Sequence, residues 1–325
     1  MRSVVATNFN GYEGLKVMER PKPEPSTDRV LVRVTAAAIN PLDHTILVGG
    51  LPRAKAPLVL GNEGAGIVED AGPSLIAPGS RVAFTGPYGA AEDGTWQEYL
   101  LVRPEDLFPL PDSVDDVTAA SMTVSYLTAF LSLRQAGFAP GKSVLAPAIG
   151  GSVGNAAYQL AAALGASRVI STAGSTPKAE TAVEAGFDDV VDLSVEGLAA
   201  GVRRMTGGAG VDIVIDSLGG TIMSEAMDVL AMKGSLVSIG YSADRIAPIN
   251  VTNLIWKDLK ISGFSIFRAS AEDIHAAWKI LLPLISSGKI EPLIDRTFPL
   301  AEAGDGLAYL IEKRPFGKVV LTMEA

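Results

Sequence analysis

The 325-residue sequence contains no cysteine. Disulfide bonds are therefore excluded, and so is any zinc site that uses thiolate ligands. No run of apolar residues reaches the roughly 20 that a membrane-spanning helix requires. The first residues also lack the continuous apolar region of a secretory signal. We therefore expect a cytoplasmic protein with no membrane partner.

The chain also lacks an excess or a cluster of basic residues. It has 27 Lys and Arg against 36 Asp and Glu, a formal net charge of −9. Such a surface repels nucleic acid and anionic membranes, so neither is an expected partner. A local basic pocket can still bind a phosphate group. Apolar residues make up 48% of the chain and charged residues 19%, which is typical of a folded globular protein and not of a disordered one.

The first third of the sequence is rich in predicted strands. Residues 29–34 alternate partly between apolar and polar side chains, as a half-buried strand does. Residues 64–72 form a second predicted strand, with glycines where backbones approach closely. Proline and glycine recur between these runs. Short strands with this punctuation predict a barrel-like or sandwich-like β domain.

The pattern changes near residue 117, where a helical stretch leads into regular alternation of apolar strands and helices. The predicted strands are 143–148, 168–172, 189–193, 211–216, 234–240 and 260–264, and the predicted helices between them are 153–164, 177–185, 195–205 and 223–230. Apolar strands separated by helices predict an α/β doubly wound parallel sheet covered on both faces. A longer helix at 270–287 and a closing strand at 318–322 follow. We expect this tail to return to the β-rich domain.

A glycine-rich turn joins the first strand of this sheet to its first helix. Its predicted cofactor-binding residues are Gly150, Gly151, Ser152, Val153 and Gly154. Glycines there permit a tight turn and let backbone N–H groups reach a pyrophosphate, and the helix N-terminus adds unpaired donors. A glycine-rich turn alone is weak evidence, but its position at the start of a run of βα units indicates a dinucleotide site.

The second strand of the sheet indicates which dinucleotide binds. An NAD site usually has Asp or Glu at the end of this strand to bind the ribose diol. Here the strand ends in small hydroxyl residues, Thr172 and Ser175, and Lys178 follows. Donors and a cation suit a 2′-phosphate, so NADPH is the predicted cofactor. Lys178 by itself could equally be a solvated helix lysine.

Six blocks along the chain together resemble the zinc-free quinone oxidoreductases of the medium-chain dehydrogenase/reductase superfamily. The blocks are 38–43, 57–66, 94–99, 127–130, 178–188 and 316–321, and the turn at 149–154 with Gln159 after it resembles the family's fingerprint. The resemblance implies a Rossmann NADPH-binding domain (residues 121–267) inserted in a β-rich GroES-like catalytic domain (1–120 and 268–325). It also implies a homodimer formed through the strand at 261–267.

The departures from the zinc-dependent relatives are informative. Those relatives use Cys and His as catalytic metal ligands, and the matching positions here are Asn40 and Asn62. An amide is a poor zinc ligand, and two amides with Glu63 would not hold the metal. The lobe with four structural cysteines is absent. We therefore predict no metal site.

The resemblance, adjacency in the sequence and the ends of the predicted strands suggest roles for single residues. Asn40 and Thr128 are expected near the nicotinamide, where Asn40 could orient the acceptor oxygen or the ribose; as alternatives, Asn40 forms a turn and Thr128 bonds its own helix. Asp43 and His44 are a candidate acid and proton donor. Tyr88 lines the substrate mouth or is an exposed loop aromatic. Further cofactor contacts are expected from Leu218, Gly240, Tyr241, Phe264, Phe267 and Lys318.

Without a metal, hydride transfer is favoured to an acceptor whose conjugation spreads the negative charge. The predicted activity is therefore NADPH-dependent reduction of a small-molecule quinone or α,β-unsaturated carbonyl. One alternative is an enoyl-thioester reductase acting on acyl-CoA. Another, of a different class, is a non-catalytic NADPH-binding sensor or structural protein.

Overall fold

The computed structural model describes residues 1–323 and shows two compact units. The first unit comprises Met1–Val124, Ser270–Ser286 and the segment from Pro292 onward, and the second comprises Ser125–Ala269 and Ser287–Glu291. The sequence predicts domain boundaries between residues 120 and 121 and between residues 267 and 268. The chain therefore leaves the first unit a few residues later than expected, and five residues after the long helix belong to the second unit.

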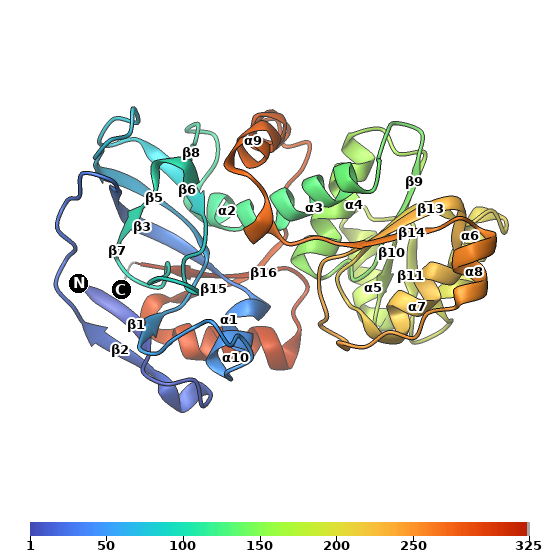
Figure 1. The fold of residues 1–325 in the computed structure, drawn as a ribbon, viewed down its shortest axis with the longest axis horizontal. Helices are drawn as coiled ribbons and strands as arrows, with labels where there is room; N and C mark the ends of the chain where they lie inside the picture. Colours follow the sequence, from blue (N-terminus) through green and yellow to red (C-terminus); the bar gives the residue numbers. More distant parts are fainter. Residues whose placement is uncertain (324–325) are drawn as a thin grey trace. The chain divides into compact units, whose positions relative to one another are not determined.

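Seven strands of the first unit form a sheet in the order β15-β16-β3-β5-β6-β8, with β7 also paired to β3 (Figure 1). Their bounds are β3 (Val30–Ile39), β5 (Glu63–Asp70), β6 (Arg81–Thr85), β7 (Tyr99–Val102), β8 (Leu107–Pro109), β15 (Ile294–Pro299) and β16 (Lys318–Thr322). All pairs are antiparallel except β15 with β16. A second, antiparallel sheet contains β2 (Leu15–Glu19), β1 (Arg2–Ala6) and β4 (Leu58–Val59).

The sequence explains why β3 lies at the centre of the larger sheet. Its first half is rich in valine, and its second half is small enough to pack between β5 and β16. Gly66 on β5 has no room for a side chain, because an added Cβ would lie 2.4 Å from the carbonyl oxygen of Arg33. Glycine at this position thus permits the close approach of β5 to β3. The expected return of the C-terminal strand is also observed, since β16 pairs with β3.

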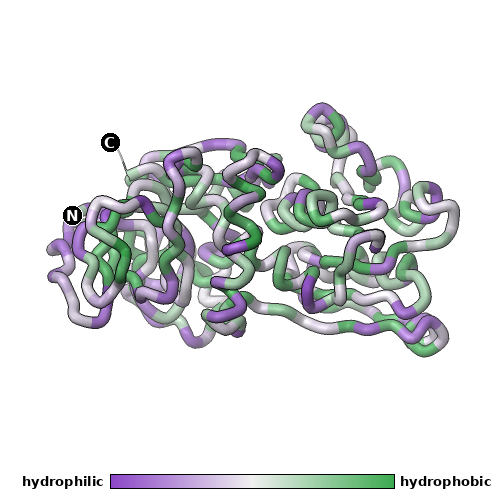
Figure 2. Tube along the Cα trace, turned by 90° about the horizontal axis from the view of Figure 1, so that it is seen from above, coloured by the Kyte–Doolittle hydropathy of each residue, from purple (hydrophilic) through white to green (hydrophobic). Residues whose placement is uncertain are grey.

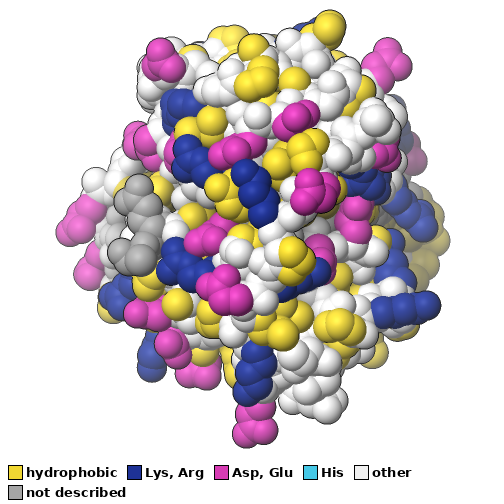
Figure 3. All heavy atoms as spheres, turned by 90° about the vertical axis from the view of Figure 1, so that its left-hand side faces the viewer, with side chains coloured by type: hydrophobic (Ala, Val, Ile, Leu, Met, Phe, Trp, Pro, Cys, Tyr) yellow, Lys and Arg dark blue, Asp and Glu magenta, His cyan; other side chains and the backbone are white. Residues whose placement is uncertain are grey.

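The helices of the first unit are α1 (Pro41–Leu47), α2 (Asp116–Ala120), α9 (Ala271–Ser286) and α10 (Ala303–Lys313), with short 3₁₀ helices at Tyr12–Gly14, Pro104–Asp106 and Leu300–Glu302. The helix α3 (Thr123–Gln135) begins in the first unit and continues into the second. On the face of the first unit seen in Figure 3, acidic and basic side chains intermingle. Some form surface ion pairs, such as Arg2 with Glu98 at 2.8 Å.

The second unit contains a parallel sheet of six strands in the order β11-β10-β9-β12-β13-β14. The strands are β9 (Ser143–Ala146), β10 (Arg168–Ala173), β11 (Val190–Asp192), β12 (Val211–Asp216), β13 (Leu230–Ser238) and β14 (Lys260–Gly263). The helices are α4 (Ser152–Ala163), α5 (Thr176–Glu184), α6 (Leu198–Thr206), α7 (Gly220–Asp228), α8 (Val251–Trp256) and a 3₁₀ turn at Ile266–Arg268. This order is that of a Rossmann fold, so the predicted fold class is confirmed.

Each unit has its own cluster of buried apolar residues. Hydrophobic segments recur along the trace of both units in Figure 2. In the second unit, Leu145, Val214 and Leu236 from three neighbouring strands are completely buried, and Leu198 and Val202 of α6 pack against the same cluster. A fully buried side chain of this size contributes roughly 1.5–3 kcal/mol. None of the helices in the described part of the chain is long and apolar enough to cross a membrane.

Several predicted elements were wrong at one or both ends. The helix expected at 195–205 begins at Leu198, because Asp192 holds Ser194 in a turn through a 2.9 Å side-chain bond to its N–H. The helix expected at 223–230 begins at Gly220 and stops before Leu230, which already pairs in the sheet. The edge strand expected at 261–267 ends at Gly263, and the 3₁₀ turn follows.

Candidate cofactor turn and buried polar cluster

The glycine-rich turn after β9 is held by the neighbouring strand β10. The N–H of Ala148 donates to Oγ1 of Thr172 at 3.0 Å, and the N–H of Ile149 donates to the Thr172 carbonyl at 2.9 Å. Helix α4 then begins with Gly151 as its N-cap, and this residue has no side chain that could accept from the first-turn amides. Those amides are therefore available to an anion at the positive end of the helix dipole.

Gly154 fixes how closely α4 approaches the turn. A Cβ at this position would lie 2.4 Å from the carbonyl oxygens of both Pro147 and Ala148. Only glycine fits there without displacing the backbone, which is the role of the third glycine in a dinucleotide-binding turn. Gly150, Gly151, Ser152, Val153 and Gly154 thus lie together at the start of α4, and their contact with a pyrophosphate stays a prediction.

The residues predicted to bind a 2′-phosphate lie at the end of β10 and the start of α5. Ser175 is the N-cap of α5, and Lys178 is half-buried in its first turn. Thr172 is completely buried, and its hydroxyl oxygen accepts from the Ala148 N–H. It therefore supports the turn directly. The acid on the next strand, Asp192, accepts hydrogen bonds from the hydroxyls of Ser194 and, at 2.6 Å, of Thr176, and these bonds lower its pKa.

Two loops close the same edge of the sheet at the carboxyl ends of β12 and β13. Asp216 is buried and accepts from the N–H groups of Leu218 at 3.0 Å and Gly219 at 3.1 Å. The N–H of Ala243 donates to the Leu218 carbonyl at 2.8 Å, which ties the second loop to the first. Leu218 and Gly240 are thereby brought to the edge where ligands bind in open α/β sheets.

Sequence reasoning missed Asp216, although a lone acid closing an apolar strand was a usable signal. Burial raises its pKa, while the two loop amides and Ser238 oppose that shift. The other residues predicted at this edge follow their strands. Tyr241 is 51% exposed, and Phe264 and Phe267 are half-buried beyond β14. Thr128 lies in α3 within the second unit and is 8% exposed.

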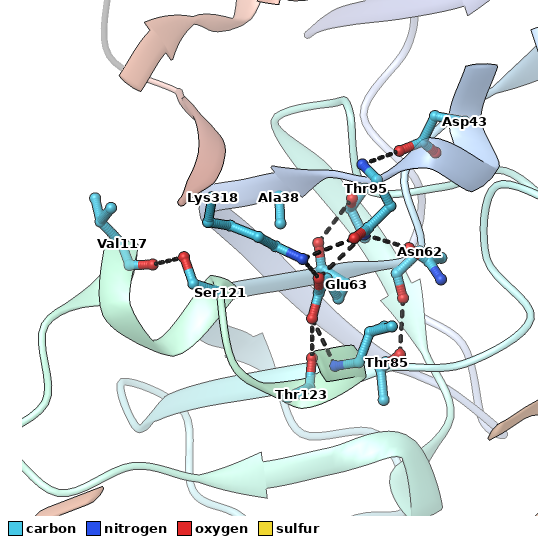
Figure 4. Close-up of polar contacts among 12 residues, drawn as sticks. Ala38, Asp43, Asn62, Glu63, Thr85, Thr95, Val117, Ser121, Thr123 and Lys318 are labelled. Atoms are coloured by element: carbon cyan, nitrogen blue, oxygen red, sulfur yellow. Dashed lines mark hydrogen bonds and ion pairs between the residues drawn. The ribbon is translucent and has the colours of Figure 1, made fainter. Parts of the chain in front are cut away.

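The first unit contains a buried polar cluster where β3, β5 and β16 meet (Figure 4). The ammonium group of Lys318 lies 2.6 Å from Oε1 of Glu63, and their side chains are 3% and 0% exposed. The other carboxylate oxygen, Oε2, accepts from Oγ1 of Thr123 at 2.9 Å and from the N–H of Val124 at 2.6 Å. Both oxygens of this buried acid are thus paired, as buried charges require.

Two asparagines extend the cluster. Oδ1 of Asn40 accepts from Lys318 at 2.7 Å, and Nδ2 of Asn40 donates to Oε1 of Glu63 at 3.0 Å and to Oδ1 of Asn62 at 2.9 Å. Lys318, which was predicted to contact the cofactor, is therefore engaged inside this cluster. Sequence reasoning placed Asn40 and Asn62 at one site but missed the Lys318–Glu63 pair, for which no local signal exists.

The side chains of Asp43 and His44 lie in different surroundings, although the two residues are adjacent in the sequence. Asp43 is 1% exposed and accepts from the backbone N–H groups of Asn40 at 2.7 Å and Gly61 at 3.0 Å. Burial raises the pKa of Asp43 to about 7, although both amides and Lys318 act in the opposite direction. His44 is half-buried, with its ring centroid 5.9 Å from that of Tyr12.

Tyr88 is neither at a substrate mouth nor an exposed loop aromatic. It is completely buried, and its hydroxyl donates to Asp106 at 2.7 Å and accepts from the N–H of Arg103 at 2.9 Å. The proline and glycine residues around it indicated a loop, but they gave no sign that the loop packs inward.

The cluster does not fit a zinc ion. Among residues 1–323, no group of three or more His, Cys, Asp or Glu side chains could hold a metal. Asn40 and Asn62 offer amides, and the Glu63 carboxylate is already neutralised by the Lys318 ammonium. A second cation there would be repelled by the first.

The Rossmann sheet with its glycine-rich turn defines the protein as one with a dinucleotide-binding fold. Two family models match: "Alcohol dehydrogenase GroES-like domain" over residues 26–112 and "Zinc-binding dehydrogenase" over residues 152–287. A quinone oxidoreductase from Pseudomonas aeruginosa is 33% identical over 96% of this chain and 97% of its own length. A 2-haloacrylate reductase from Burkholderia sp is 31% identical over 93% of this chain and 92% of its own length. The chain belongs to the quinone oxidoreductase family of the medium-chain dehydrogenase/reductase superfamily.

Two solved structures are similar over nearly the whole chain. A protein described as an NAD-dependent alcohol dehydrogenase has a TM-score of 0.89 and 32% identity, with all of both chains covered. A mycobacterial protein complexed with NADPH has a TM-score of 0.88 and 29% identity, covering 99% of each chain. Both descriptions thus name a nicotinamide cofactor, which is NAD in the first and NADPH in the second.

Proposed function

We propose that this protein reduces a quinone or another conjugated carbonyl compound with NADPH, without a metal ion. The observation that carries this proposal is the buried Lys318–Glu63 pair, which supplies a fixed internal cation bonded to Asn40. By the resemblance, Asn40 and its partner Asn62 stand where zinc-dependent relatives have metal ligands. A conjugated acceptor spreads the incoming negative charge over several atoms. It therefore needs no strong Lewis acid, whereas a simple ketone does.

The second unit fits the cofactor on its own geometry. The amides at the start of α4 are suited to the pyrophosphate, and the absence of a Cβ at Gly154, where one would clash with two carbonyl oxygens, keeps the turn tight. Bound NADPH supplies the hydride. Lys178 and Ser175 would bind the 2′-phosphate, since no acid stands at the end of β10 to bind a ribose diol. The relative complexed with NADPH supports this preference, and the one named NAD-dependent opposes it.

Turnover of a small acceptor panel tests the proposal. NADPH oxidation would be followed spectroscopically with 1,4-benzoquinone, cyclohex-2-enone, crotonyl-CoA and cyclohexanone, and NADH would serve as the parallel donor. We expect turnover of the quinone and the enone with NADPH, little with NADH, and none with cyclohexanone. Cyclohexanone reduction equal to that of the enone would contradict the proposal.

The same panel separates the alternatives. A preference for crotonyl-CoA would favour an enoyl-thioester reductase, and no turnover with NADPH still bound would favour a non-catalytic binding protein. A 2-haloacrylate is an α,β-unsaturated carboxylate, so the 2-haloacrylate reductase among the relatives is consistent with a conjugated acceptor. The homodimer also remains a prediction. Its expected edge is β14, the last strand of the sheet. The helix that precedes it in the sequence, α8, exposes Ile255 and Trp256 at 66% and 76%.

A further inference from the structure

The charge of Lys318 fixes which way the Asn40 amide points. An ammonium group can only donate hydrogen bonds, so the atom of Asn40 that lies 2.7 Å from Lys318 Nζ must be the oxygen. The Asn40 nitrogen therefore faces the other way. Its two N–H groups are both used, on Glu63 Oε1 and on Asn62 Oδ1. Asn40 thus has no N–H left for a ligand.

The Asn40 amide in turn fixes which way the Asn62 amide points. Because Asn40 presents an N–H, the atom of Asn62 that receives it must be the oxygen, at 2.9 Å. The nitrogen of Asn62 is then the outer end of a chain that starts at the buried ammonium. In Figure 4, Glu63 lies between Lys318 and Asn62. Asn40 joins these two residues through its own hydrogen bonds. Amides linked in series polarise one another, so the last N–H is a stronger donor than an isolated amide.

Asn62 has no internal use for this donor. Its backbone carbonyl accepts from Thr85 Oγ1 at 2.9 Å and its side-chain oxygen accepts from Asn40, but within residues 1–323 its Nδ2 group makes no hydrogen bond. The residue is only 3% exposed. Nδ2 is nevertheless not one of the fully buried side-chain nitrogens that lack a partner, so this atom keeps contact with solvent. An oriented donor that no protein group uses, at an atom that solvent reaches, therefore indicates a place for an external acceptor atom.

We propose that Asn62 Nδ2 donates a hydrogen bond to the carbonyl oxygen of the acceptor, with Lys318 and Asn40 as positioning residues. This inference rests on the proposed function. When hydride forms a C–H bond at the β carbon of an enone, the C=C pair shifts toward the carbonyl carbon and the C=O pair moves onto oxygen. The oxygen becomes anionic, and a proton from water completes the α carbon. Asn62 stabilises the oxygen while it carries that charge.

Asn62→Leu and Asn62→Asp test the role. The Leu variant removes the donor, and the Asp variant keeps an acceptor for Asn40 while replacing the outer N–H by an oxygen. Both should lower kcat for cyclohex-2-enone on the order of 100-fold. They should lower it much less for 1,4-benzoquinone, which is far more electrophilic. The affinity for NADPH should stay within a factor of about 2. Gln97→Met is the matched control, since Gln97 is a buried amide of the same unit that donates to Gly94.

The ratio of enone to quinone turnover distinguishes catalysis from damage, because a partly unfolded protein loses both activities in proportion. A lower ratio in both Asn62 variants, with an unchanged ratio in Gln97→Met, supports the inference. An unchanged ratio in the Asn62 variants overturns it, whatever their absolute rates. Wild-type protein that reduces neither acceptor overturns the proposed function itself. The double variant Lys318→Met with Glu63→Gln, which leaves no unpaired buried charge, should lower the same ratio without weakening NADPH binding.

Discussion

The Lys318 ammonium and the Glu63 carboxylate form an ion pair at 2.6 Å in the interior of the first unit. They are 255 residues apart in the sequence. They meet because β16 pairs with β3, where Val319 lies opposite Ile39, and β5 pairs with β3, where Gly64 lies opposite Ala37. Each side chain lies at the first residue of its strand. The pair therefore joins the C-terminal strand to the N-terminal sheet.

Breaking this pair on one side should destabilise the protein strongly. Glu63→Gln or Lys318→Met alone leaves an uncompensated buried charge, which costs roughly 3–5 kcal/mol. The double variant removes both charges and should be more stable than either single variant. Calorimetric unfolding of the four proteins measures this coupling. Lys142→Ala is the control, because Lys142 pairs with Asp212 at the surface with 48% of its side chain exposed, and it should change stability by less than about 1 kcal/mol. Additive effects of the two single substitutions would contradict the expected coupling.

Gly154→Ala should impair cofactor binding. Alanine favours a helix over glycine by about 1 kcal/mol, so propensity alone would make this variant more stable. The added Cβ would instead press on the carbonyl oxygens of Pro147 and Ala148 at 2.4 Å and displace the turn. We expect NADPH affinity, measured by fluorescence titration, to fall at least 10-fold. Gly197→Ala in the same unit meets only a side-chain oxygen of Glu225 at 3.7 Å and should bind normally. Equal affinities in the two variants would show that the turn is not the binding site.

Lys178→Ala should separate the two nicotinamide cofactors. Loss of a hydrogen bond from an ammonium to a phosphate costs roughly 1.5–3 kcal/mol, so the Kd of NADPH should rise on the order of 10- to 100-fold. The Kd of NADH should not change, because NADH lacks that phosphate. Isothermal titration with both cofactors gives the comparison, and Lys142→Ala again controls for loss of a lysine from the same unit. A parallel loss for NADH would place Lys178 outside a 2′-phosphate site.

Asp43 should make stability depend on pH. Burial raises its pKa from 3.8 to about 7. The native state therefore binds more protons than the unfolded state between these values, and stability falls as pH rises through this window. Asp43→Asn cannot titrate. Relative to the variant, the wild-type protein should lose about 2–3 kcal/mol between pH 5 and pH 8. Thermal unfolding of both proteins at several pH values measures the difference, and a difference that is constant with pH would refute the expected titration.

The sequence by itself determined the Rossmann sheet and its glycine-rich turn, because both are local. Apolar runs of strand length indicate buried parallel strands. Glycines in residues 150–154 are required because the turn packs closely against the first turn of the helix. The ends of elements were less certain. Whether residues 195–197 belong to the helix that follows them depends on the turn made by Asp192. This turn depends on side-chain hydrogen bonds that periodicity does not reveal.

Only the tertiary structure decided how the polar residues are used. Asn40, Asn62 and Lys318 were visible one by one in the sequence, but the direction of each amide follows from the buried ammonium and from strand pairing across the whole chain. Asp43 and His44 are adjacent in sequence, yet one is buried and bonded to backbone amides while the other contacts Tyr12. The physical reason is that burial and hydrogen-bond partners depend on long-range packing, whereas strand and helix patterns depend mainly on neighbours along the chain.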